Sequence, residues 1–373
     1  MKTLKSSDVI IVGAGIAGTS LAANLSQHRS VTVLEMEQHP GFHATGRSAA
    51  YYAPSYGNSV VQAVTNASGE FFHTPPDGFS ATSLINNRPA MFVATGEQRK
   101  SLNQLLGSNA DLELINSAEI KDRVSIIDKG LIVQAALDLV GGDLDVDALM
   151  QGFLRQLKQR DGELVTREQV IKLDYKDTLW QVTTSNEIFQ ASIIVNAAGA
   201  WADEIAVLAG IGKLGLQPKR RTVALVSPPT GVDVSGWPLV VDVDEQFYFK
   251  PDAGQLLTSP ADETPLDACD AYPEEHDVAL GIDRIQQIAS LEVQRINHSW
   301  AGLRTFARDK TFVSGFDPRS TGFYWLAGQG GYGVQSCAAM ADIATGLIAG
   351  HCDLISAGAI NDLAEKLSPA RLL

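Results

Sequence analysis

The feature that most constrains the fold is a glycine-rich turn near the N-terminus. Residues 13–18, GAGIAG, fit the pattern GxGxxG. An apolar β-branched run precedes the turn at residues 8–12, and a helical pattern follows it at residues 16–28. A second apolar run, residues 31–34, ends at Glu35. A strand, helix and strand in this order, with glycines at the first turn, predict a Rossmann-like dinucleotide-binding unit.

Each position of the motif has a mechanical reason. Gly13 allows the tight turn, Gly15 lets the backbone approach a diphosphate, and Gly18 lets the helix pack closely on the strand. The helix N-terminus favours the diphosphate charge. An acidic residue after the second strand accepts hydrogen bonds from ribose hydroxyls and would repel a 2′-phosphate. The residues predicted to bind the cofactor here are Gly13, Gly15, Ile16, Ala17, Gly18 and Glu35.

Composition narrows the class of protein. The 373 residues suffice for two domains. Hydrophobic residues make up 45% and charged residues only 19%, which favours a parallel sheet buried on both faces. With 29 basic and 43 acidic residues, the net charge of −14 disfavours nucleic acid as a partner. The three cysteines lie far apart and show no metal-ligand spacing, so we predict no metal site.

The N-terminal apolar stretch has the outline of a secretory signal. Residues 9–27 carry no charge, and Lys2 and Lys5 precede them. Asp8 at the start of the run and the glycines within it argue against cleavage, which would also destroy the nucleotide motif. We therefore expect the segment to be retained, with no integral membrane segment and a cytoplasmic location, or a peripheral one at the inner membrane.

Later segments favour FAD over NAD. The sequence HATGRS, residues 43–48, follows the second strand, where an extended cofactor could continue. A third apolar run, residues 193–195, leads into Asn-Ala-Ala-Gly-Ala. The C-terminal region contains a second glycine-rich loop, residues 330–333, whose backbone groups would be accessible to a cofactor. Strand-rich stretches separate these nucleotide-type segments, so we predict a discontinuous cofactor domain wrapped around a second domain.

With these motifs, the chain resembles the D-amino-acid oxidase-type family of FAD enzymes, and within it the bacterial D-arginine dehydrogenases. The resemblance covers nearly the whole chain and is carried by TGRSAA (45–50), VNAAGAW (195–201), GLQPKRR (215–221), FYFKPDAG (247–254), WAGLR (300–304) and QGGYG (329–333). It implies a mixed α/β (α+β) fold: a Rossmann-like FAD-binding domain and a substrate domain built on an antiparallel sheet. We predict the FAD-binding domain at 1–85, 145–216 and 300–373, and the substrate-binding domain at 86–144 and 217–299.

The resemblance also implies a reaction and a site. A D-amino acid would lose a hydride from Cα to flavin N5, and the imino acid would hydrolyse to an oxo acid and ammonia. Arg221 and Arg304 match the arginines that grip the substrate carboxylate, a task suited to the planar guanidinium fork. Tyr56 and Tyr248 match tyrosines that touch the substrate, and Gly331 matches the glycine whose carbonyl accepts from the amine. A basic turn for Arg221, and a structural salt bridge for Arg304, are the alternatives.

Further cofactor contacts follow from the same motifs. The predicted residues are Arg47, Ser48, Ala49, Ala198, Gly199, Gly330, Gly331, Tyr332, Gly333 and Gln335. Oxygen-using relatives place a lysine over the flavin, but the corresponding stretch, residues 254–258, has none. No cysteine lies near Arg304, where those enzymes attach the flavin. We predict a noncovalent FAD and an acceptor other than oxygen, with a quinone as one candidate.

Two positions depart from the D-arginine enzymes. Ala90 stands where they have a glutamate that pairs with the guanidinium, and Tyr51 replaces a histidine. A buried guanidinium without that carboxylate would lose about 3 kcal/mol or more. We therefore predict a preference for neutral or apolar D-amino acids.

Two other functions stay open. One is a glycine/sarcosine-type amine oxidase that uses oxygen, and the other is a non-catalytic flavin-binding subunit of a larger complex. The carboxylate-binding arginine pair argues against the silent subunit. The sequence leaves the oligomeric state open.

Overall fold

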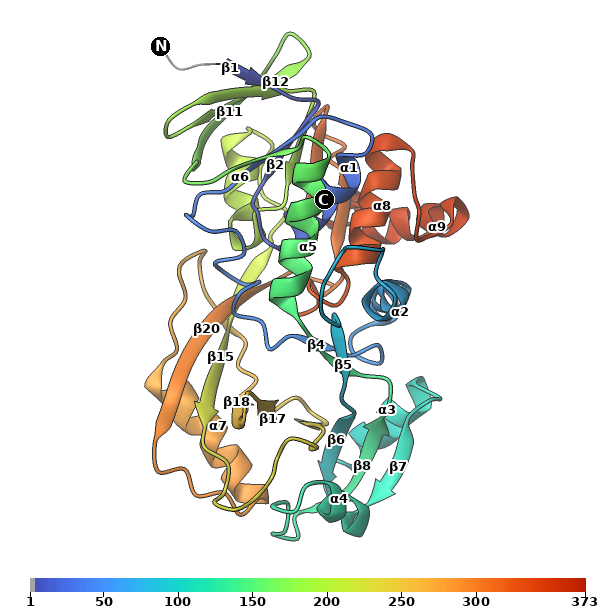
Figure 1. The fold of residues 1–373 in the computed structure, drawn as a ribbon, viewed down its shortest axis with the longest axis vertical. Helices are drawn as coiled ribbons and strands as arrows, with labels where there is room; N and C mark the ends of the chain where they lie inside the picture. The colour runs from blue at the N-terminus through green and yellow to red at the C-terminus, as the bar shows by residue number, and fades with distance from the viewer. Residues whose placement is uncertain (1–3) are drawn as a thin grey trace.

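The computed structural model describes residues 4–373, and Figure 1 shows an elongated molecule with sheets at both ends. A six-stranded sheet forms the centre of the upper part in that view. Its strand order is β10 (Glu163–Val165), β3 (Val31–Leu34), β2 (Val9–Val12), β14 (Ile193–Asn196), β22 (Phe323–Ala327) and β21 (Val313–Phe316). All neighbouring pairs are parallel except β21–β22.

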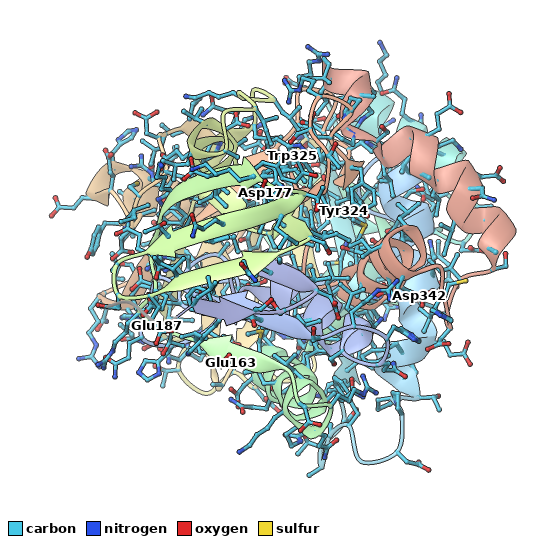
Figure 2. The ribbon with its side chains drawn as sticks, turned by 90° about the horizontal axis from the view of Figure 1, so that it is seen from above. Glu163, Asp177, Glu187, Tyr324, Trp325 and Asp342 are labelled. Carbon is cyan, nitrogen blue, oxygen red and sulfur yellow. The ribbon has the colours of Figure 1, made fainter. Side chains whose placement is uncertain are left out.

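Both faces of this sheet are covered, as the low charge content predicts. Helices α1 (Ile16–Leu25), α5 (Val146–Gln159) and α8 (Cys337–Ala349) lie on one side. Helix α6 (Ala202–Leu208) and a second sheet lie on the other, with strand order β1 (Leu4–Ser6), β13 (Ile188–Ala191), β12 (Leu179–Thr184) and β11 (Val170–Lys176). On β22, Tyr324 belongs to the core on the helical side and Trp325 to the core under the second sheet, as Figure 2 shows.

The lower part of the molecule is built on a nine-stranded sheet. The strand order is β19 (Thr264–Pro265), β15 (Gln217–Val226), β18 (Gln255–Ser259), β17 (Tyr248–Asp252), β16 (Leu239–Asp242), β6 (Ala90–Thr95), β8 (Ile132–Asp138) and β7 (Glu113–Asn116), and β20 (Ile296–Phe306) pairs with β15. Its pairs are antiparallel except β16–β6. Helix α7 (Glu275–Ile288) packs on one face, against a core that includes Phe249 and Val240.

A small sheet and four further α-helices complete the fold of the described residues. A three-stranded sheet has the order β4 (Tyr51–Tyr52), β9 (Gly142–Leu144) and β5 (Ile85–Asn87). The other helices are α2 (Ser59–His73), α3 (Arg99–Ser108), α4 (Ser117–Arg123) and α9 (Ala357–Leu367).

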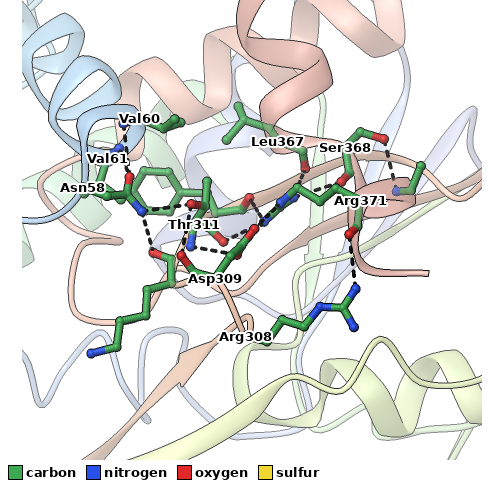
Figure 3. Close-up of polar contacts among 12 residues, drawn as sticks. Asn58, Val60, Val61, Arg308, Asp309, Thr311, Leu367, Ser368 and Arg371 are labelled. Atoms are coloured by element: carbon green, nitrogen blue, oxygen red, sulfur yellow. Dashed lines mark hydrogen bonds and ion pairs between the residues drawn. The ribbon is translucent and has the colours of Figure 1, made fainter.

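The C-terminal end is fastened to the start of α2 through a chain of polar contacts (Figure 3). Arg371 pairs with Asp309 at 2.7 Å and donates to the carbonyl oxygens of Thr311 and Phe312. The Thr311 hydroxyl accepts from Asn58, whose side chain caps α2. The loop just before α2 is therefore supported from the far end of the chain.

The mixed α/β fold predicted from the sequence is confirmed. The predicted strand 31–34 coincides with β3, and the predicted helix 16–28 ends earlier, at Leu25. The predicted domain boundary at residue 217 falls at the start of β15, whereas the boundary at 300 falls inside β20; the domain assignment itself stays a prediction. Among residues 4–373, no helix is long and apolar enough to cross a bilayer.

Candidate active site

A long cleft runs from the carboxyl ends of β2 and β3 to the face of the nine-stranded sheet. Its lining includes Gly13 and Glu35 at one end and Arg221, Tyr248 and Arg304 at the other. Ligands of open α/β sheets bind at the carboxyl ends of the strands. The cleft therefore joins the predicted nucleotide end to the predicted substrate end.

The GxGxxG turn has the geometry that its glycines predict. Gly13 has a φ of +102°, and a Cβ there would lie 2.6 Å from the Ala197 carbonyl oxygen. A Cβ at Gly18 would lie 2.0 Å from the Gly13 carbonyl oxygen, so only glycine lets α1 pack this closely. One Glu35 oxygen accepts from the Ala14 N–H at 2.7 Å and the other from the Glu37 N–H at 2.9 Å. These bonds fix the carboxylate in the cleft wall and leave acceptor positions on both oxygens.

The middle of the cleft is walled by two loops. Ser48 and Ala49 line it from one loop, and Ala198 and Gly199 line it from the segment after β14. Arg47 also lines it, but its guanidinium is committed to the protein, because it pairs with Asp270 and donates to the carbonyl oxygens of residues 271 and 301. The Arg47 side chain therefore ties this wall to β20 of the nine-stranded sheet.

The substrate end gathers two guanidinium groups on adjacent strands. Arg221 lies on β15, and Arg304 lies on β20. Arg221 is 6% exposed, and its nearest acidic oxygen is Glu263 Oε1 at 3.5 Å. Burial, together with the neighbouring Arg304 guanidinium, lowers the pKa of Arg221. Two cations on neighbouring strands in a buried site favour an anion between them.

Several polar atoms at this end have no protein partner. Among the described residues, Arg221 Nε and the Tyr248 hydroxyl are buried without a hydrogen-bond partner. Within residues 4–373, Arg304 also forms no hydrogen bond or ion pair with another side chain. Because buried polar groups are normally satisfied, these unpaired groups indicate a ligand with hydrogen-bond acceptors.

The backbone at Gly331 lies against Arg304. A Cβ at residue 331 would lie 2.8 Å from Arg304 Nη1 and 2.9 Å from Cζ. The Arg304 guanidinium can therefore occupy this position only because residue 331 has no side chain. Gly330 and Gly333 line the cleft beside it.

Other predicted site residues lie beside the cleft rather than in its lining. The Tyr56 hydroxyl donates to Glu245 at 2.8 Å, and burial, followed by the Glu245 charge, raises the pKa of Tyr56 well above its ordinary value. Tyr51 donates to the Arg88 carbonyl oxygen, and Ala90 is buried on β6.

Two predicted cofactor residues hold neighbouring structure in place. The Tyr332 ring packs against Tyr56, with ring centroids 5.3 Å apart, and lies in the core beside α8. Gln335 Oε1 accepts from the Ala53 N–H at 2.9 Å, and its amide donates to Thr65. Gln335 therefore supports the loop that carries Tyr56.

The cleft also contains residues that the sequence did not single out. The Thr45 hydroxyl accepts from the Ile16 N–H at 3.0 Å and so fastens the cleft wall to the start of α1. Glu168 and Cys269 line the cleft as well. Thr45 could have been inferred, since it belongs to the segment after the second strand, but Cys269 has no signal in the sequence.

The chain fits FAD on its own geometry. Gly13 and Gly15 line the nucleotide end of the cleft without side chains, and the cleft continues to a cationic end. Gly13, Gly15 and Glu35 would hold the nucleotide, and the Ser48, Ala198 and Gly330 segments would hold the remainder. Within the described part of the chain, no group of three or more His, Cys, Asp or Glu side chains could hold a metal ion.

The chain is similar to curated proteins at low identity. It is 24% identical over 385 residues to FAD-dependent oxidoreductase domain-containing protein 1 of Xenopus laevis, covering 88% of this chain and 76% of that protein. It is 25% identical over 221 residues to the Bos taurus protein of the same name, covering 54% of this chain. That match spans 44% of the bovine protein.

Solved structures share the fold. Glycine oxidase from Geobacillus kaustophilus superposes with a TM-score of 0.86 at 17% identity, covering 98% of this chain and 99% of the other. L-proline dehydrogenase from P. horikoshii superposes with a TM-score of 0.84 at 20% identity, covering 99% of this chain and 98% of the other. The L-α-glycerophosphate oxidase from Mycoplasma pneumoniae was solved with FAD bound. It superposes with a TM-score of 0.82 at 20% identity, covering 92% of this chain and 95% of the other.

The family described as FAD dependent oxidoreductase (DAO) matches residues 8–347, which is most of the chain. The nucleotide cradle and the length of the cleft agree with that match. This chain is therefore an FAD-dependent oxidoreductase of the DAO family.

Proposed function

We propose that this protein is an FAD-dependent dehydrogenase of D-amino acids. The observation that carries the proposal is the set of unpaired donors at the cationic end of the cleft: the buried Arg221 Nε and Tyr248 hydroxyl, with the Arg304 guanidinium beside them. An α-carboxylate supplies the charge and the acceptor positions that these donors lack.

The residues at this end would orient the substrate and prepare its amine. Arg221 and Arg304 would fix the carboxylate, and the Tyr248 hydroxyl would donate to it. The Gly331 carbonyl oxygen would accept from the amine. Two nearby cations disfavour a protonated amine, so they lower its pKa and favour the neutral form that can lose a hydride from Cα. The bound FAD would supply the hydride acceptor.

The surroundings of Ala90 support a preference for neutral or apolar side chains. Ala90, Leu239 and Tyr248 belong to one buried apolar cluster. Asp138 lies directly across the β6–β8 ladder from Ala90, but its oxygens accept from the Ser55 hydroxyl at 2.6 Å and the Val140 N–H at 3.0 Å. A charged substrate side chain would lose its hydration here, with the Asp138 carboxylate already engaged.

The proposal is tested by mixing the FAD-loaded protein with single D- and L-amino acids in the absence of oxygen. We expect neutral D-amino acids to bleach the flavin absorbance and their L-enantiomers to leave it unchanged. Arg221→Met should raise the concentration needed for half-maximal bleaching by about tenfold or more, because a charge-assisted pair is lost. Arg123→Met, at an exposed position on α4, is the matched control.

The same experiment separates the alternatives. Bleaching by glycine or sarcosine, with hydrogen peroxide formed at the turnover rate in air, would replace the proposal with an amine oxidase. If no amino acid bleaches the flavin, the dehydrogenase and the amine oxidase are both rejected, and the non-catalytic flavin-binding subunit is the function that is left. An acceptor other than oxygen and the cytoplasmic location remain predictions.

A further inference from the structure

A second cavity adjoins the cleft and has no role in the reaction described above. Its volume is about 320 Å³, within the range of small-molecule sites. Ser48 and Ala49 line both cavities, so one short loop separates them. The opposite wall includes Lys250, Leu257 and Trp300, which lie on β17, β18 and β20 of the substrate sheet.

The cavity contains a buried ammonium group with unused donors. Lys250 lies two residues after Tyr248 on β17, so both side chains emerge from the same face of the sheet. Lys250 is 3% exposed, and its Nζ lies 2.6 Å from Asp143 Oδ1. The other Asp143 oxygen pairs with Arg88 Nε at 2.5 Å. An ammonium has three donors, and this ion pair engages one of them.

The charge balance identifies the class of ligand. Two cations, Arg88 and Lys250, and two carboxylates, Asp143 and Asp252, line the cavity, so its formal charge is zero. A neutral cavity gives little net attraction to an anion such as phosphate. Donors on a buried lysine suit a neutral molecule with carbonyl oxygens.

The remaining walls suit a flat ring. Trp300 is held in place because its indole N–H donates to the Arg47 carbonyl oxygen at 3.1 Å and its ring stacks on His298, with centroids 5.5 Å apart. Leu257 and Pro251 add apolar surface. The exposed residues Ala253 and Gly254 lie at the rim, so a ligand can enter without passing Arg221 and Arg304.

We propose that this second cavity binds the electron acceptor, a quinone, with one carbonyl oxygen accepting from Lys250 and the ring beside Trp300. The proposal rests on the proposed function for the source of electrons. The quinone would gain two electrons from the reduced flavin across the loop that separates the two cavities and two protons from solvent, and would leave as the hydroquinone, while the flavin releases its own two protons as it is reoxidised. The Lys250 ammonium would stabilise negative charge that develops on the quinone oxygen.

The test uses the FAD-loaded protein reduced with dithionite, which makes it independent of any amino-acid substrate. Reoxidation by ubiquinone-1 is followed from the flavin absorbance without oxygen. Lys250→Met should slow reoxidation at low quinone concentration by about tenfold or more, since a hydrogen bond from a charged donor is lost. Asp143 keeps Arg88 as a partner in this variant, so the fold should persist. Lys172→Met, at an exposed lysine paired with Asp174, is the matched control.

A second measurement records binding without turnover. Ubiquinone-1 should quench the tryptophan fluorescence of the oxidised protein, and Trp300→Phe should remove most of that quenching. Ferricyanide, a small anion that needs no ring pocket, should reoxidise Lys250→Met and the unmodified protein at equal rates.

Reoxidation of Lys250→Met by ubiquinone-1 at the unmodified rate, or quenching unchanged in Trp300→Phe, would overturn the proposal. Failure of D-amino acids to reduce the flavin, with the Lys250 effect intact, would reject only the proposed function.

Discussion

A substitution at Gly331 tests whether the Arg304 guanidinium binds the substrate carboxylate. The Cβ of Gly331→Ala would lie 2.8 Å from Arg304 Nη1, against about 3.4 Å for an ordinary contact, so the guanidinium must retreat by about 0.6 Å. The backbone at this residue is outside the left-handed region, and the obstructing group ends a flexible side chain. We therefore expect the variant to fold and load FAD normally.

The retreat should weaken carboxylate binding. A hydrogen bond to a charged group contributes about 1.5–3 kcal/mol. If the displacement removes about 1 kcal/mol of this, the Kd of a simple carboxylate rises about fivefold. The assay is a titration with benzoate, followed by the change in the flavin spectrum.

A double-mutant cycle with Arg304→Lys makes the test specific. A lysine lacks the planar group that packs on residue 331, so adding Gly331→Ala to Arg304→Lys should cost little further. A benzoate Kd that is unchanged in Gly331→Ala would refute the reasoning. So would effects of the two substitutions that simply add.

Two further predictions concern the glycine turn at residues 13–18 and the contacts of Arg371 with Asp309 and the neighbouring carbonyl oxygens. In Gly18→Ala the new Cβ would lie 2.0 Å from the Gly13 carbonyl oxygen, so we expect the variant to lose FAD, measured as flavin absorbance per mole of protein. Gly107→Ala is the control, because its Cβ would point into open space on α3, and it should bind FAD fully. Arg371→Met should reduce the free energy of unfolding in urea by about 1–3 kcal/mol, because it removes the ion pair with the partly exposed Asp309 and the donor to several carbonyl oxygens. Burial alone would raise the pKa of Asp309, but the Arg371 and Thr311 donors hold this pKa below its ordinary value. The Arg371–Asp309 pair therefore stabilises the fold above the unfolded pKa of about 3.9. This stabilisation is lost as the pH falls through the lower pKa of Asp309 in the folded protein. An Arg371→Met variant as stable as the unmodified protein at pH 7 would contradict this account.

The cofactor turn was predictable because its determinants are local. Gly13, Gly18 and Glu35 lie within one strand–helix–strand unit, and each has a steric or hydrogen-bonding reason that a short sequence expresses. The nine-stranded sheet was harder to predict, because its strands pair across long stretches of chain. The parallel pairing of β6 with β16 joins residues 90–93 to 239–242, and nothing in either segment specifies that register.

Most of the residues that the sequence singles out line the cleft, but the sequence does not give the direction of each side chain. Gly331 and Tyr332 are neighbours, yet one lies against Arg304 and the other packs its ring in the core. Similarly, nothing near Arg47 indicates that its guanidinium binds residues 270 and 271. Such contacts depend on the assembled tertiary structure, which brings together segments that are distant in the sequence.

The Arg47 bridge makes the loop at residues 270–271 part of the cofactor's environment. The segment that walls the cleft is anchored by its guanidinium to this loop and to the Ala301 carbonyl oxygen. We therefore expect changes in the 270–271 loop to alter cofactor affinity through their effect on this wall. For an engineer or for natural selection, this loop offers a remote way to adjust how tightly the protein retains its flavin, while the glycine turn and the paired arginines stay unchanged.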